Sequence, residues 1–183
     1  VTMEGADGNF VNSLSFVSES TATINETYTL PSGKKRIYVN KCKETILSFT
    51  NGNGLPVKLY VRAYDDGVAF RYGFPGSGQR SILKETTGFR IPLGYRAWGQ
   101  PDFPYEVYEG CNETEYISGI VGTNFFATSY PNKNPNILVL YTPPDTGFWV
   151  LLTEAGIYGD YCGGQLTKSN NGLYSVSLWD AKV

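Results

Sequence analysis

Glu154 is the acidic residue with the clearest setting for chemistry. It follows four apolar residues and Thr153 in the segment WVLLTEAGIYGDY, residues 149–161. We expect the apolar run to form a buried strand, so that Glu154 lies where the chain leaves the core, a position that often carries function. A glutamate that points into solvent or pairs with an arginine is the alternative interpretation, and the spacing alone favours it.

Several acidic pairs in the sequence could supply the two facing carboxylates that glycoside hydrolysis needs. Turn chemistry explains Asp65-Asp66 better than catalysis does. The spacings of the others are unremarkable for strands or loops, so we expect no catalytic pair within this chain. The remaining candidates are Glu106 with Glu109, Glu113 with Glu115, and Asp160.

Aromatic side chains form a second candidate site, because the apolar faces of sugars favour flat rings. Trp98, Phe103, Tyr105 and Tyr108 lie close together in the sequence. From these we predict Trp98, Tyr105 and Tyr108 as substrate-binding residues. A loop held in place by ordinary aromatic anchors is the alternative.

Composition excludes several kinds of chemistry. The chain has no histidine, which excludes Ser-His-Asp triads, imidazole-based zinc sites and histidine acid–base pairs. The net charge is −2 without a basic stripe, so no nucleic-acid partner is expected. No apolar run approaches the roughly 18 residues of a membrane span. The chain has three cysteines, Cys42, Cys111 and Cys162. The sequence does not decide whether all three are free thiols or whether two form a disulfide and one is left unpaired.

The elements that position these residues are predicted to be strands. Aromatic residues make up 15% of the chain, with 21 glycines and 10 prolines, and no amphipathic helix is evident. We expect an all-β domain of roughly ten to twelve strands in a sandwich or a pair of large twisted sheets. With 183 residues, the chain is predicted to be one domain, 1–183. Because it starts at Val1 without an initiator methionine, we expect a piece of a longer protein.

The segment Val57–Phe74 shows the alternation of a β-hairpin. Asp66-Gly67 predicts a tight type I′ turn. A two-residue loop at that place would set Arg62 opposite Arg71, which is unfavourable. We therefore expect acidic side chains nearby, or a three-residue loop, Asp65 to Gly67, that shifts the register.

Two further apolar runs are predicted to be buried strands. Ile137–Tyr141 (ILVLY) is nearly continuous, which is typical of a strand buried on both faces. Phe148–Thr153 (FWVLLT) is the next predicted buried strand. The segment 143–147 between them has turn composition, so the two strands are antiparallel if this turn closes a hairpin.

Three segments carry a resemblance to a known family. They are RAYDDGVAFRY (62–72), FRIPLGYRAWGQP (89–101) and WVLLTEAGIYGDY (149–161). Together they resemble the N-terminal domain of glycoside hydrolase family 97, which contains α-glucosidases and α-galactosidases of Bacteroidetes. The resemblance runs from about Tyr28 to Tyr161. Val1–Glu26 resembles the family poorly, and the strands that lead into the family's catalytic barrel are absent.

The resemblance implies a large antiparallel β-sandwich of the galactose-mutarotase-like (supersandwich) type. It implies a catalytically silent domain that braces a C-terminal (β/α)₈ barrel of the same polypeptide and walls its pocket. Glu154 matches the family position that contributes one ligand to a Ca²⁺ ion, which the fragment alone is not expected to hold tightly. The parent reaction would be hydrolysis of α-glycosidic bonds in oligo- or polysaccharides, in the bacterial periplasm or outside the cell.

The sequence leaves two alternative functions. A free-standing carbohydrate-binding module would bind glycans through exposed aromatic rings without any partner domain. An active mutarotase is the third possibility, and the absence of histidine for acid–base work on the sugar ring argues against it.

Overall fold

The computed structural model describes residues 2–3, 9–78, 82–101, 117–123, 135–156, 163–167 and 171–178. These residues form thirteen strands and no helix, which confirms an all-β, sandwich-like fold. Within this part of the chain nothing forms a helix long and apolar enough to cross a membrane. The chain divides into two compact units, Val1–Leu83 and Lys84–Val183, and each is described separately.

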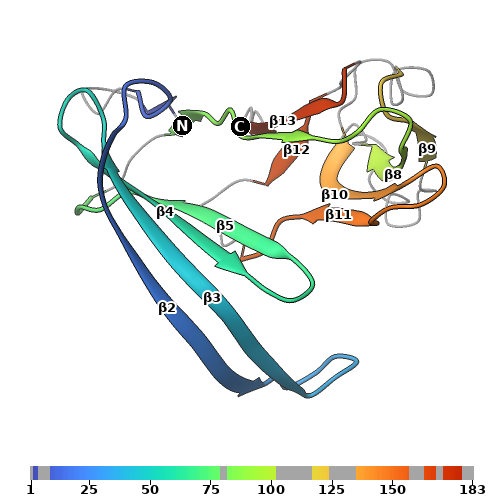
Figure 1. Ribbon diagram of the computed structural model, residues 1–183, viewed down its shortest axis with the longest axis horizontal. Helices are drawn as coiled ribbons and strands as arrows, with labels where there is room; N and C mark the ends of the chain where they lie inside the picture. The colour runs from blue at the N-terminus through green and yellow to red at the C-terminus, as the bar shows by residue number, and fades with distance from the viewer. Residues whose placement is uncertain are drawn as a thin grey trace. The chain divides into compact units, whose positions relative to one another are not determined.

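The first unit contains an antiparallel sheet with the strand order β2-β3-β4-β5 (Figure 1). β2 and β3 pair along their whole length, whereas β4 pairs with β3 only from Lys43 to Thr50. The far ends of β2 and β3 therefore extend beyond the sheet as a two-stranded ribbon. The strands are β2 (Ser15–Thr29), β3 (Ile37–Thr50), β4 (Pro56–Ala63) and β5 (Val68–Gly73), and β1 (Thr2–Met3) pairs separately with β6 (Ile82–Lys84).

β4 and β5 form the predicted hairpin, but its turn lies one residue earlier than expected. Ala63 pairs with Val68, and the backbone N–H of Tyr64 donates to the carbonyl oxygen of Gly67 at 2.8 Å. The two central residues are therefore Asp65 and Asp66. Gly67 does not have a positive φ, so the predicted type I′ turn at Asp66-Gly67 is wrong.

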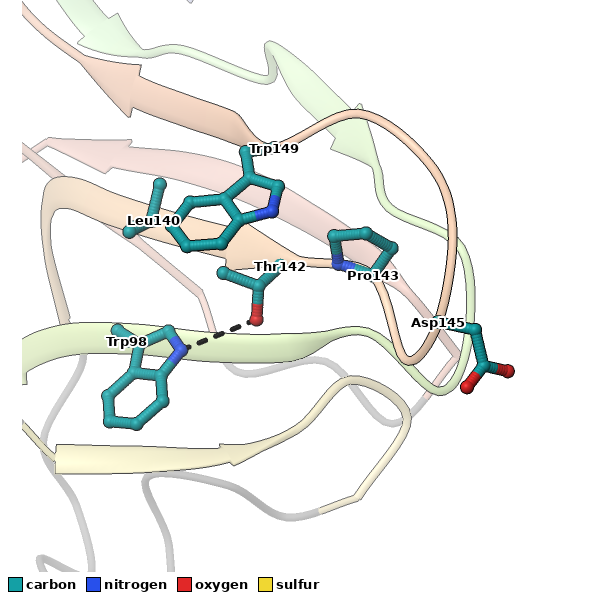
Figure 2. Close-up of a pocket in the computed structure, with 6 residues that line it drawn as sticks. All are labelled: Trp98, Leu140, Thr142, Pro143, Asp145 and Trp149. Atoms are coloured by element: carbon teal, nitrogen blue, oxygen red, sulfur yellow. Dashed lines mark hydrogen bonds between the residues drawn. The ribbon is translucent and has the colours of Figure 1, made fainter.

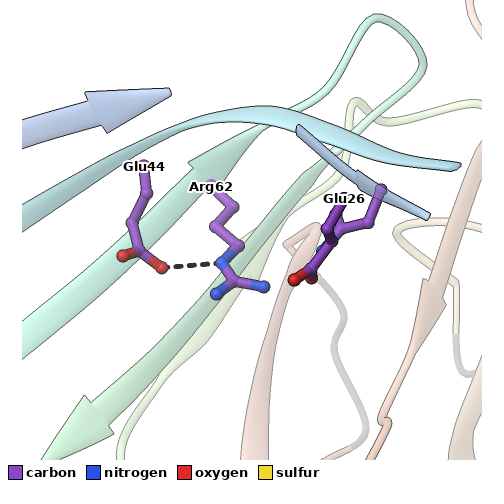
Figure 3. Close-up of polar contacts among 4 residues, drawn as sticks. Glu26, Glu44 and Arg62 are labelled. Atoms are coloured by element: carbon purple, nitrogen blue, oxygen red, sulfur yellow. Dashed lines mark hydrogen bonds and ion pairs between the residues drawn. The ribbon is translucent and has the colours of Figure 1, made fainter. Parts of the chain in front are cut away.

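This register separates the two arginines of the hairpin. Arg62 lies opposite Ala69, and Arg71 lies opposite Tyr60, whose ring centroid is 4.5 Å from the Arg71 guanidinium carbon. The predicted acidic neighbour is present. Arg62 Nε donates to Glu44 Oε2 at 2.7 Å (Figure 3), and this hydrogen bond raises the pKa of Arg62.

The core of the first unit is small. Phe10 and Val57 are its buried members, and the rings of Phe10 and Phe74 meet edge to face with centroids 5.1 Å apart. Cys42 on β3 is buried and is a free thiol. Cys111 and Cys162 lie outside the described residues.

The second unit is built on a seven-stranded sheet in the order β7-β13-β12-β10-β8-β9, with β11 also paired to β10. Its central strand, β10, is visibly curved (Figure 1). The register of β10 with β8 shifts between Pro135 and Val139, a bulge-like irregularity of the kind that bends strands. The strands are β7 (Gly88–Arg90), β8 (Arg96–Pro101), β9 (Ile117–Ile120), β10 (Pro135–Thr142), β11 (Val150–Thr153), β12 (Gly164–Leu166) and β13 (Leu173–Leu178).

The inner face of this sheet encloses the larger core. Tyr141 and Tyr174 are its largest fully buried side chains, with ring centroids 5.6 Å apart. Neither hydroxyl has a hydrogen-bond partner among the described residues. The other buried members are Ile91, Ala97, Val121, Ile137, Val139, Leu166 and Val176.

β10 and β11 form the predicted antiparallel hairpin, with Leu138 opposite Thr153 and Tyr141 opposite Val150. Burial on both faces, however, is wrong. Leu138 is 41% exposed between buried Ile137 and Val139. β11 begins at Val150, so the predicted strand Phe148–Thr153 is too long at its start. Each strand has only one face on the core, and the apolar side chains of the other face point outward.

Candidate functional site

Glu154 directly follows β11 and is half-buried. Its Oε2 atom accepts a hydrogen bond from the backbone N–H of Gly164, the first residue of β12, at 2.9 Å. A Cβ atom at position 164 would lie 2.9 Å from Glu154 Oε1 and 2.7 Å from Ile137 Cδ1. The absence of a side chain at Gly164 therefore allows the carboxylate to approach the backbone this closely.

Glu154 forms no ion pair with an arginine within the described part of the chain. The same residues contain no group of three or more His, Cys, Asp or Glu side chains arranged to hold a metal ion. A Ca²⁺ ion takes six to eight oxygen ligands. Glu154 thus fits the role of one oxygen donor, and the described residues do not complete a site around it.

Trp98 lies on β8, and 39% of its surface is exposed. Its indole Nε1–H donates to Thr142 Oγ1 at 3.4 Å, and the Thr142 hydroxyl donates to the carbonyl oxygen of Arg96 at 3.4 Å. The guanidinium carbon of Arg96 is 5.7 Å from the Trp98 ring centroid. These contacts orient the indole on the outer face of the sheet.

Trp98 belongs to a shallow open pocket of about 400 Å³ (Figure 2). Trp149, which is 70% exposed, lies on the other side of β10. Sequence reasoning missed Trp149 because it assigned this residue to a buried strand. A strict alternation from the inward-facing Val150 would have placed it outward. The lining residues are Trp98, Leu140, Thr142, Pro143, Asp145 and Trp149.

The other predicted site residues fall into two groups. Asp65 and Asp66 form the turn between β4 and β5, as their turn chemistry predicted. Tyr105 and Tyr108 lie outside the described residues. The same holds for Phe103, Glu106, Glu109, Glu113, Glu115 and Asp160.

Comparison with known proteins decides the family. The family model described as "Glycosyl-hydrolase 97 N-terminal" matches residues 1–178. The chain belongs to glycoside hydrolase family 97. A probable retaining alpha-galactosidase of Streptomyces bingchenggensis is 27% identical over 184 aligned positions, which span 100% of this chain and 26% of the relative.

Solved structures of glycoside hydrolases share this fold. The family 97 enzyme of Pseudoalteromonas sp. strain K8, in complex with acarbose, matches with a TM-score of 0.76 at 22% identity, over 97% of this chain and 26% of that one. A beta-arabinopyranosidase matches with a TM-score of 0.76 at 24% identity, over 99% of this chain and 30% of that one. The chain therefore spans about a quarter of the length of these relatives.

Proposed function

We propose that this chain acts as the non-catalytic N-terminal domain of a larger family 97 glycoside hydrolase. The observation that supports it is the family match over residues 1–178, within relatives about four times as long. A relative named as an alpha-galactosidase supports a parent reaction at an α-glycosidic bond. The acid and the base or nucleophile would come from a (β/α)₈ barrel elsewhere in the polypeptide.

In this proposal the domain braces the barrel, walls one side of its pocket and supplies Glu154 as one ligand to a Ca²⁺ ion. The bond from the Gly164 backbone holds Oε2, and Oε1 accepts no hydrogen bond from the described residues. A carboxylate fixed in this way at a strand end is suited to complete a cation site made by other oxygen donors. We place the enzyme in the bacterial periplasm or outside the cell, where such an enzyme meets oligo- and polysaccharides.

The test uses the complete polypeptide that carries this chain, assayed on α-glucosides and α-galactosides. Chelation should abolish hydrolysis, and added Ca²⁺ should restore it. Glu154→Gln should raise the Ca²⁺ concentration needed for half-maximal activity at least about tenfold, because a charged ligand is lost. The exposed Glu19→Gln on β2 is the matched control. Unchanged calcium dependence in Glu154→Gln would show that the ligand assignment is wrong.

A further inference from the structure

The outer face of β8, β10 and β11 has an unusual composition for a solvent-exposed sheet surface. Leu140 on β10 lies opposite both Trp98 on β8 and Leu151 on β11. Trp98, Trp149 and Leu151 are 39%, 70% and 56% exposed. Single exposed apolar residues are ordinary, but a contiguous exposed patch marks an interaction surface.

We propose that the pocket on this face binds α-linked oligosaccharides, with sugar rings stacked on Trp98 and Trp149. Trp98 and Trp149 flank β10, so their backbones lie about 10 Å apart, or two strand spacings. Leu140 and Thr142 form the floor between them (Figure 2). A surface of this width takes more than one sugar ring, which favours an oligosaccharide over a single monosaccharide.

The pocket is preorganised on one side. Thr142 Oγ accepts the Trp98 indole N–H and donates to the Arg96 carbonyl, so Trp98 needs no reorientation to present its ring. Binding loses less conformational entropy when an aromatic anchor is already held in place. Trp149 is the more exposed of the two, at 70%, so it has more apolar surface to bury.

The polar groups of the pocket suit a neutral, hydroxyl-rich ligand. Asp145, in the β10–β11 turn, lines the far end of the pocket, and its carboxylate points away from the two tryptophans (Figure 2). A carboxylate accepts hydrogen bonds from sugar hydroxyls and repels anionic ligands such as phosphates. A few polar groups in a mainly apolar, aromatic lining are the usual composition of small-molecule sites.

The inference rests on the proposed function for the class of sugar, but its residues are separate from the proposed calcium ligand. Glu154 does not line the pocket. Along β11 the outward Leu151 alternates with Val150 and Leu152, which pack against the core. The two proposals can therefore fail independently.

The experiment is calorimetric titration of the 183-residue chain with maltotetraose and with stachyose, which carry α-linked glucose and galactose respectively. Tryptophan emission is a second readout, because two of the three tryptophans lie in the pocket. Trp98→Ala and Trp149→Ala should each weaken binding at least about tenfold, as expected for truncated aromatic anchors. Trp149→Phe should keep more affinity than Trp149→Leu, since only phenylalanine retains a flat ring.

Two exposed phenylalanines outside the pocket serve as controls. Phe148→Ala removes the 86% exposed neighbour of Trp149, and Phe70→Ala removes a side chain about as exposed as Trp98 on the other unit. Both variants should bind like the parent. Circular dichroism and a cooperative melt check that each protein is folded.

The proposal is overturned if neither oligosaccharide binds the folded chain, or if the tryptophan variants bind as the parent does. It is also overturned if acrylamide cannot quench Trp149 in the complete polypeptide without sugar, because this face would then be a docking surface for the rest of the protein. Hydrolysis of α-glycosides by the complete polypeptide tests the proposed function separately.

Discussion

Glu154 and Gly164 are joined by a 2.9 Å hydrogen bond from the glycine backbone to the carboxylate. Gly164→Ala would push a Cβ atom against Glu154 Oε1 and Ile137 Cδ1. We expect a loss of about 1–3 kcal/mol in the free energy of unfolding, the usual effect of overpacking. Denaturant titration checks it. Gly67→Ala is the control, because nothing lies within 4 Å of its added Cβ. Equal stability of both variants would contradict this geometry.

Tyr141→Phe should stabilise the protein. The hydroxyl of Tyr141 is fully buried without a partner among the described residues, so folding removes it from water without compensation. Replacing it by phenylalanine should raise the free energy of unfolding by about 1 kcal/mol. Tyr28→Phe, at a 47% exposed position, should change little. Destabilisation by Tyr141→Phe would reveal that the hydroxyl does have a hydrogen-bond partner.

Stability should fall at alkaline pH because of the two buried tyrosines of the second unit, Tyr141 and Tyr174. Burial raises the pKa of Tyr141 and Tyr174 above the ordinary value of 10.0. Above pH 10 the unfolded chain therefore loses these protons while the folded chain keeps them, so unfolding becomes more favourable as the pH rises. Below pH 10 this contribution is fully present. Melting curves between pH 8 and 11.5 should show the decline, and the Tyr141→Phe, Tyr174→Phe double variant should show a shallower one.

The Arg62–Glu44 pair should contribute little to stability. The Arg62 side chain is 36% exposed and Glu44 is 15% exposed, so solvent screens the pair. A double-mutant cycle with Arg62→Ala and Glu44→Ala should give a coupling energy of at most about 1 kcal/mol. This coupling should weaken in 1 M salt. A salt-independent coupling above that value would mean that the pair is effectively buried.

Local patterns predicted the fold class well and the burial of individual strands less well. The alternation in Val57–Phe74 and the turn composition of residues 143–147 each located a hairpin. The exact position of the turn did not follow from the sequence. The observed register keeps Arg62 and Arg71 from facing each other and sets Arg71 against the Tyr60 ring, which outweighs the local preference of Asp66-Gly67 for a type I′ turn. ILVLY was assigned to a strand buried on both faces because continuous apolar runs usually are. Here its two outward leucines, Leu138 and Leu140, belong to an exposed apolar surface.

The candidate site was predicted in part. The position of Glu154 after an apolar run correctly placed it at a strand end, but nothing in the sequence indicated that Gly164, ten residues later, would hold it. Trp98 was predicted as a sugar-binding residue with two tyrosines nearby in sequence. The two tyrosines lie outside the described residues, and the structure places Trp98 and Trp149 in one pocket, through pairing of β8 and β11 to opposite sides of β10. Proximity of this kind depends on tertiary topology, which spacing along the chain does not encode.

The ribbon of β2 and β3 has a consequence for any longer protein that contains this unit. Among the described residues β2 bonds to β3 on one side only, so the other side presents amide and carbonyl groups along a strand of fifteen residues. Such an edge accepts a further strand through main-chain hydrogen bonds. Whichever segment adds to the sheet there would be aligned by main-chain bonding along β2, largely independently of its side chains.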